Sequence, residues 1–98
     1  MNTRHSERQV FLALARLEAD YYALFPEDYY QTIVGESQWD GFHLQQLRQL
    51  AAKRAWNDML HYIYYGLDTA LREAVQDAIQ QASPRLYQKM FFSPNNIR

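Results

Sequence analysis

Histidine is the residue type with which catalytic or metal chemistry would have to begin, because the chain has three histidines and no cysteine. The absence of cysteine excludes a disulfide framework, a thiolate zinc site and a cysteine nucleophile. His43 and His61 lie eighteen positions apart, which on one helix is five turns and about 27 Å, so their rings do not bind one metal ion together. Asp58 and His61 have the spacing of half a di-metal site, but the sequence holds no second half. We expect an ordinary surface pair there, with a metal or acid–base site as the weaker alternative.

Glycine and serine do not form a phosphate-binding or nucleophile motif in this chain. The glycines stand singly at positions 35, 41 and 66, so neither a phosphate-cradling loop nor a dinucleotide fingerprint is present. The serines occur in helix-cap or turn contexts without the flanking residues of a nucleophile elbow. The sequence therefore predicts a protein that is not an enzyme and that has no catalytic residue, resident metal or cofactor.

Aromatic residues give the strongest functional signal, since they make up 15% of the chain. Six of the eight tyrosines form adjacent pairs, at 21–22, 29–30 and 64–65. Adjacent helical residues point about 100° apart, so both rings of a pair do not reach the centre of one core. Tyrosine, tryptophan and arginine dominate binding hot spots. We expect one partner-binding surface of Tyr22, Tyr29, Tyr30, Trp39 and Phe42, and a second of Tyr64 and Tyr65 with Arg54, although the rings could instead fill a small core.

Charge is unevenly distributed although the net charge is only −1. Between Leu17 and Leu47 there are six acidic residues and no Lys or Arg, whereas Arg48, Lys53 and Arg54 follow directly. These three cations predict an alternative function, a helix face that contacts nucleic acid. A nucleic-acid-binding domain is usually strongly basic, and here the isoelectric point is about 6.3. Nucleic acid is therefore the less favoured partner.

Helical periodicity extends through most of the chain and positions these residues. Val10, Leu14, Leu17, Tyr21 and Leu24 form the apolar stripe of the first predicted helix. Ser6 with Gln9 has capping-box spacing, and Asp40, Asp68 and Ser83 are expected to cap later helices. Gly35 and Gly66 are expected to end the helices before them. The sequence predicts an all-α fold, a small four- or five-helix bundle in one domain (1–98), with helices at about 7–24, 26–34, 41–65, 69–82 and 84–92 and a tail at 93–98.

The longest uninterrupted apolar run is Val10 to Ala15, far short of the roughly 20 residues that a membrane span needs. The first residues also lack the features of a signal peptide, so we expect a cytoplasmic protein that does not enter a membrane. We expect a non-enzymatic protein–protein interaction module: a small adaptor, chaperone, or inhibitor or modulator of a larger protein or enzyme, of the kind also carried by phages. The alternatives are the nucleic-acid-associated regulator and a homodimeric structural protein.

Overall fold

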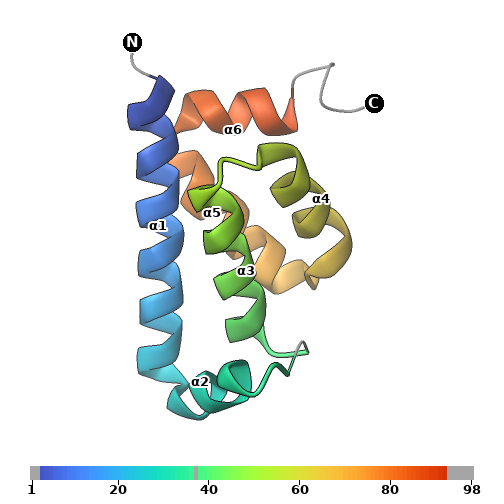
Figure 1. Cartoon of the computed structure of the whole chain (residues 1–98). Helices are drawn as coiled ribbons and strands as arrows, with labels where there is room; N and C mark the ends of the chain where they lie inside the picture. The colour runs from blue at the N-terminus through green and yellow to red at the C-terminus, as the bar shows by residue number, and fades with distance from the viewer. Residues whose placement is uncertain (1–2, 37, 93–98) are drawn as a thin grey trace.

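The computed structural model describes residues 3–36 and 38–92, and all regular structure in them is helical, which confirms the all-α prediction (Figure 1). The long helix α1 packs mainly against α3 and α5, while α2 and α6 lie at opposite ends of α1. The predicted tail at 93–98 lies outside the described residues. The helices are α1 (Thr3–Leu24), α2 (Pro26–Ile33), α3 (Asp40–Ala52), α4 (Trp56–Gly66), α5 (Thr69–Ala82) and α6 (Pro84–Phe91).

The core is aliphatic apart from Phe91 and is supplied by every helix except α2. Its fully buried side chains stand at helical spacing on each element, as the periodicity predicts. The other aromatic rings that touch this core are partly buried and lie at its edge. The buried apolar residues are Val10, Leu14, Leu44, Leu47, Ala51, Met59, Ile63, Leu67, Leu71, Val75, Ile79, Leu86, Met90 and Phe91.

The predicted helix at 41–65 is wrong, because a turn divides it into α3 and α4. Arg54 has a left-handed backbone, with φ 55°. Its N–H donates to the Ala51 carbonyl, and the Ala55 N–H donates to the Leu50 carbonyl, both at 3.0 Å. These two bonds form a Schellman motif, in which a left-handed residue closes a helix. Arginine here takes a conformation that is usual for glycine. The described residues therefore form six helices, whereas four or five were predicted.

Two of the predicted caps are confirmed. The Asp68 carboxylate accepts a hydrogen bond from Leu71 N–H at 2.8 Å, and the Ser83 hydroxyl accepts one from Leu86 N–H at 3.2 Å. The capping box at Ser6 is wrong because α1 already begins at Thr3, which places Ser6 inside the helix. The confirmed caps are local contacts within four residues, which is the range over which sequence spacing is informative.

The cap predicted at Asp40 is also wrong, and the group that replaces it comes from another helix. Asp40 is the first residue of α3, and Trp39 at the N-cap position makes no capping hydrogen bond with its side chain. Instead, the Gly41 N–H donates to the Asp28 carboxylate of α2 at 2.7 Å. A Cβ at Gly41 would lie 2.5 Å from that carboxylate and 2.6 Å from the Tyr22 ring. Glycine therefore lets α2 approach the start of α3, and α2 is attached there by a polar contact.

Candidate protein-binding surface

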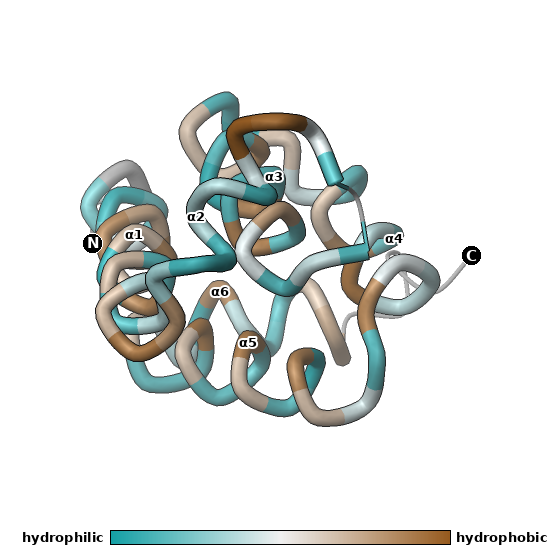
Figure 2. The backbone as a smooth tube through the Cα atoms, turned by 90° about the horizontal axis from the view of Figure 1, so that it is seen from below, coloured by the Kyte–Doolittle hydropathy of each residue, from teal (hydrophilic) through white to brown (hydrophobic). Residues whose placement is uncertain are grey.

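The helix α2 exposes its apolar residues and buries a polar one. Its only buried residue is Asp28, which is 4% exposed. Tyr29 with Ile33, and Tyr30 with Val34, form two adjacent rows at four-residue spacing that face away from the bundle. Figure 2 shows the end of α2 as an apolar arc at the outer edge of the molecule. We call the six large, at least half-exposed apolar side chains of this region the α2 surface: Leu24, Phe25, Tyr29, Tyr30, Ile33 and Val34.

Ring contacts connect the two ends of the α2 surface through half-buried tyrosines of α1. Phe25 contacts Tyr21 with ring centroids 4.9 Å apart, and Tyr21 contacts Tyr22 at 6.0 Å. Tyr22 in turn contacts Tyr29 at 5.3 Å, and Tyr29 contacts Tyr30 at 6.1 Å, both edge to face. Edge-to-face pairs at these distances are mutually stabilising. The exposed rings are therefore held on a layer of supporting rings.

Polar contacts behind this layer fix the orientation of α2. The Tyr22 hydroxyl donates to Thr32 Oγ1 at 2.9 Å, and the Thr32 hydroxyl donates to the Asp28 carbonyl at 2.9 Å. Gly35 has φ 83°, and the Glu36 N–H donates to the Gln31 carbonyl at 3.0 Å. Gly35 thus ends α2 as predicted, by the left-handed turn that glycine allows.

The structure divides the first predicted surface of Tyr22, Tyr29, Tyr30, Trp39 and Phe42. Tyr29 and Tyr30 are exposed, and Trp39 is 37% exposed in the loop before α3. Tyr22 and Phe42 are partly buried, so they support neighbouring side chains instead of presenting their own rings.

Four members of the α2 surface are absent from the sequence-based prediction: Leu24, Phe25, Ile33 and Val34. Leu24 is predicted to lie in the apolar stripe of the first helix, but it is 75% exposed, because the buried residues of α1 end at Leu14. Asp28 and Thr32 lie four positions apart and form a polar face on this helix. This spacing is visible in the sequence, and it indicates that the apolar residues on the opposite face are exposed.

Acidic side chains adjoin the α2 surface. Glu27 lies on α2, Glu36 lies in the loop after it, and Asp40 begins α3. Within the described residues none of these three carboxylates forms an ion pair. Burial raises the pKa of Asp40, and the charges of Asp68 and Asp28 raise it further. The carboxylates of Asp28, Asp40 and Asp68 therefore repel one another, and together with Glu27 and Glu36 they give this end of the molecule a negative potential.

The second predicted surface is not one site. Tyr64 and Tyr65 are exposed in the last turns of α4, where Tyr64 contacts Phe91 and Tyr65 contacts His61. Arg54 precedes the other end of α4, and the helix between them is about 14 Å long at 1.5 Å per residue. Tyr64 and Tyr65 thus stay together, but Arg54 is separated from them.

Two of the three basic residues that could contact nucleic acid form ion pairs with acidic residues of α1. Arg48 Nε lies 2.5 Å from a Glu18 carboxylate oxygen, and Arg54 lies 3.9 Å from Glu7. Of the three predicted cations, Lys53 has no ion pair with the residues that the structure describes. These pairs reduce the positive charge that the helix face offers to phosphates.

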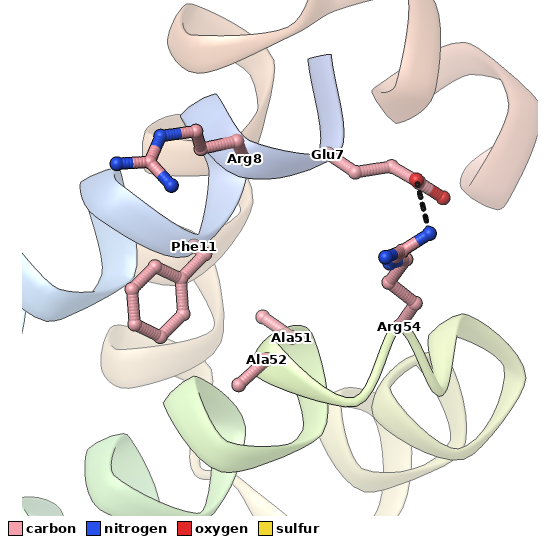
Figure 3. Close-up of a pocket in the computed structure, with 6 residues that line it drawn as sticks. All are labelled: Glu7, Arg8, Phe11, Ala51, Ala52 and Arg54. Atoms are coloured by element: carbon pink, nitrogen blue, oxygen red, sulfur yellow. Dashed lines mark ion pairs between the residues drawn. The ribbon is translucent and has the colours of Figure 1, made fainter. Parts of the chain in front are cut away.

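Arg54 and Glu7 also line a pocket of about 320 Å³ between α1 and the turn that joins α3 to α4 (Figure 3). Phe11 and two alanines form its wall. Glu7 accepts a hydrogen bond from Trp56 Nε1 at 2.7 Å and faces Arg54 on its other oxygen. The Glu7 carboxylate therefore connects α1 to the turn between α3 and α4 through these two contacts.

Within residues 3–36 and 38–92, no group of three His, Asp or Glu side chains is placed to hold a metal ion. The His61 ring lies against Tyr65, with ring centroids 4.6 Å apart. No helix in the described part of the chain combines the length and apolar character that a membrane span requires.

The comparisons with known proteins give no further indication of function. No protein-family model, curated protein or solved structure matches this chain.

Proposed function

We propose that this chain is a non-enzymatic interaction module that binds another cytoplasmic protein through the α2 surface, as an adaptor, chaperone, inhibitor or modulator of that protein. The single observation that supports the proposal is the orientation of α2, which buries Asp28 and exposes Tyr29, Tyr30 and Ile33. Small monomeric proteins rarely expose a contiguous group of large apolar side chains unless it binds something.

The energetics of the fold support this use. Burial of one large apolar side chain stabilises a fold by about 1.5–3 kcal/mol, and none of the six side chains of the α2 surface is buried in this structure. Binding a partner would bury them instead. The supporting rings of Tyr21 and Tyr22 hold the exposed rings in place beforehand, and such preorganisation lowers the entropic cost of association.

Affinity capture with three forms of the full chain tests this proposal. We would immobilise the wild type, the variant Tyr30→Ala/Ile33→Ser and the control Tyr64→Ala/Tyr65→Ala. The control is matched because both pairs of residues are exposed on helices. We expect one partner to be retained by the wild type and the control and to be lost by the α2 variant. Circular dichroism would verify that all three are folded. Equal retention of the same proteins by all three forms would contradict the proposal.

A further inference from the structure

The charges near the α2 surface restrict the chemistry of what can cover it. From Leu17 to Leu47 the chain has six acidic residues and no Lys or Arg. Arg48, the first cation after this segment, is paired with Glu18. Glu27 and Glu36, the acidic residues on α2 and in the loop directly after it, form no ion pair with any described residue. An approaching surface therefore meets apolar side chains bordered by uncompensated negative charge.

A second copy docking through the same surface would be opposed by this charge. A two-fold interface places the same patch on both subunits, so the acids beside one α2 would face those beside the other. Like charges across an interface disfavour association by up to several kcal/mol. Two copies of the α2 surface are therefore complementary in apolar character but repel each other through their acidic residues.

A cationic partner matches both features. Lys and Arg flanking an apolar face would meet Glu27 and Glu36, and they would also be attracted to the faces of exposed tyrosine rings. Tyr30 is 69% exposed and offers such a face. Arginine is favoured over lysine for this role because its guanidinium both stacks on rings and forms bidentate bonds with carboxylates.

The shape of the α2 surface favours a helical partner. Its two rows at four-residue spacing are the kind of ridge that packs into the grooves of another helix, with axes about 8–10 Å apart. The eight residues of α2 extend about 12 Å, which covers two to three turns of a facing helix. An extended strand has no sheet edge to join here, because all regular structure in the described residues is helical.

We propose that the partner presents an amphipathic helix whose apolar face packs on the α2 surface and whose flanking Lys and Arg residues meet Glu27 and Glu36. This inference rests on the proposed function and specifies the partner's chemistry.

Two synthetic helical peptides test the inference against the full chain by fluorescence anisotropy. Both would be about 14 residues long, longer than α2, with the same leucine stripe, and one would carry Arg and Lys where the other carries Glu. We expect the basic peptide to bind about tenfold more tightly at low salt, the sum of several weak ion pairs. High salt should reduce this preference, because it screens exposed charges.

Three variants assign the contributions. Glu27→Gln/Glu36→Gln should remove most of the preference for the basic peptide, whereas the matched control Glu73→Gln/Asp77→Asn, on exposed positions of α5, should leave it unchanged. Tyr30→Ala/Ile33→Ser should abolish binding of the basic peptide.

Other occupants would give other results. Equal binding of both peptides, lost in Tyr30→Ala/Ile33→Ser, would overturn the inference about charge and leave the proposed function standing. A dimer in light scattering that this variant dissociates would identify a second copy as the occupant, and neutral lipid vesicles bound through the same residues would identify a lipid surface. Either result would overturn the inference. Failure of the capture experiment, in contrast, would contradict the proposed function itself.

Discussion

The helices α2 and α6 have the same length and the same kind of start but opposite roles in the structure. Each has eight residues and begins with proline, which suits the first helical position. The helix α6 is capped by Ser83 and buries Leu86, Met90 and Phe91. The helix α2 has no side-chain cap and buries only Asp28. Helix α6 therefore contributes to the core, whereas the apolar residues of α2 remain exposed.

The difference arises from how each helix is attached. The helix α6 packs through apolar residues at four- and five-residue spacing, so the hydrophobic effect orients it. The helix α2 is oriented by the Asp28 carboxylate at the start of α3 and by the Tyr22 and Thr32 hydroxyls. A helix held by its polar face necessarily turns its apolar residues toward solvent. An amphipathic pattern therefore predicts a helix but not which of its faces is buried.

The largest expected effect is a difference in the free energy of unfolding between variants in α6 and variants in α2. Leu86→Ala or Met90→Ala should lower the free energy of unfolding by about 2–5 kcal/mol, because each creates a cavity in the core. Tyr30→Ala on α2 should change it by less than about 0.5 kcal/mol, as exposed substitutions usually do. Urea unfolding followed by circular dichroism measures both values. Comparable losses in the two helices would show that α2 is also part of the core.

The second prediction concerns the close approach of α2 to α3. In Gly41→Ala the new Cβ would overlap the Asp28 carboxylate and the Tyr22 ring, so α2 has to move. Overpacking of this kind costs about 1–3 kcal/mol. Hydrogen exchange should show faster exchange of the α2 amides and unchanged exchange in α6. A uniform change over both helices would contradict a local role for this contact.

A smaller effect is expected from the carboxylate itself. Asp28→Ala removes the acceptor for the Gly41 N–H and should lower the free energy of unfolding by about 0.5–2 kcal/mol, the usual value of a helix cap. The loss should fall in the lower part of that range, because Asp28 Oδ1 is buried without a hydrogen-bond partner in the described structure. Asp28→Asn keeps an oxygen acceptor and should cost less than Asp28→Ala. If the two variants were equally stable in thermal unfolding, the cap would contribute nothing.

The smallest effect is confined to alkaline solution. Burial, and then the Asp28 carboxylate, raise the pKa of Tyr21 in the folded protein. The unfolded phenol ionises near its ordinary pKa of about 10. The contribution of the neutral Tyr21 side chain to the free energy of unfolding is therefore complete below about pH 10 and is lost as the pH rises above this value.

The variant Tyr21→Phe tests this pH dependence. It should flatten the decline of the melting temperature above about pH 10 and leave the pH dependence near neutrality unchanged. A residual slope is expected, because burial also raises the pKa of Tyr22 and Tyr62. An unchanged alkaline decline would contradict the burial of the Tyr21 hydroxyl.

Local contacts explain which parts of the fold could be predicted from the sequence. The caps at Asp68 and Ser83 and the stop at Gly35 act within one helical turn, and the helices they bound were predicted to within about two residues. The break at Arg54 was missed because the left-handed residue that closes α3 is neither glycine nor asparagine. The apolar periodicity continues across the turn, so it predicted one helix where two are present.

The candidate site could be predicted only in part, for a related reason. The tyrosine pair at 29–30 indicated exposed rings because adjacent helical residues diverge, and both rings are exposed. Leu24 and Ile33 were not predicted, because hydropathy does not tell which side of a short helix faces the bundle. The deciding contact joins Asp28 to Gly41, thirteen positions along the chain, and no spacing rule connects them.

The proposal that a partner protein binds the α2 surface is tested most directly by comparing Tyr30 on α2 with Tyr65 on α4. These are the two most exposed tyrosines of the molecule, at 69% and 80%. A photo-crosslinking amino acid would replace one or the other in the full chain, and the products would be analysed by mass spectrometry after irradiation in the cell. Binding through the α2 surface should give one dominant protein adduct from position 30 and no corresponding adduct from position 65. The same adducts from both positions, or an adduct from position 65 alone, would contradict it.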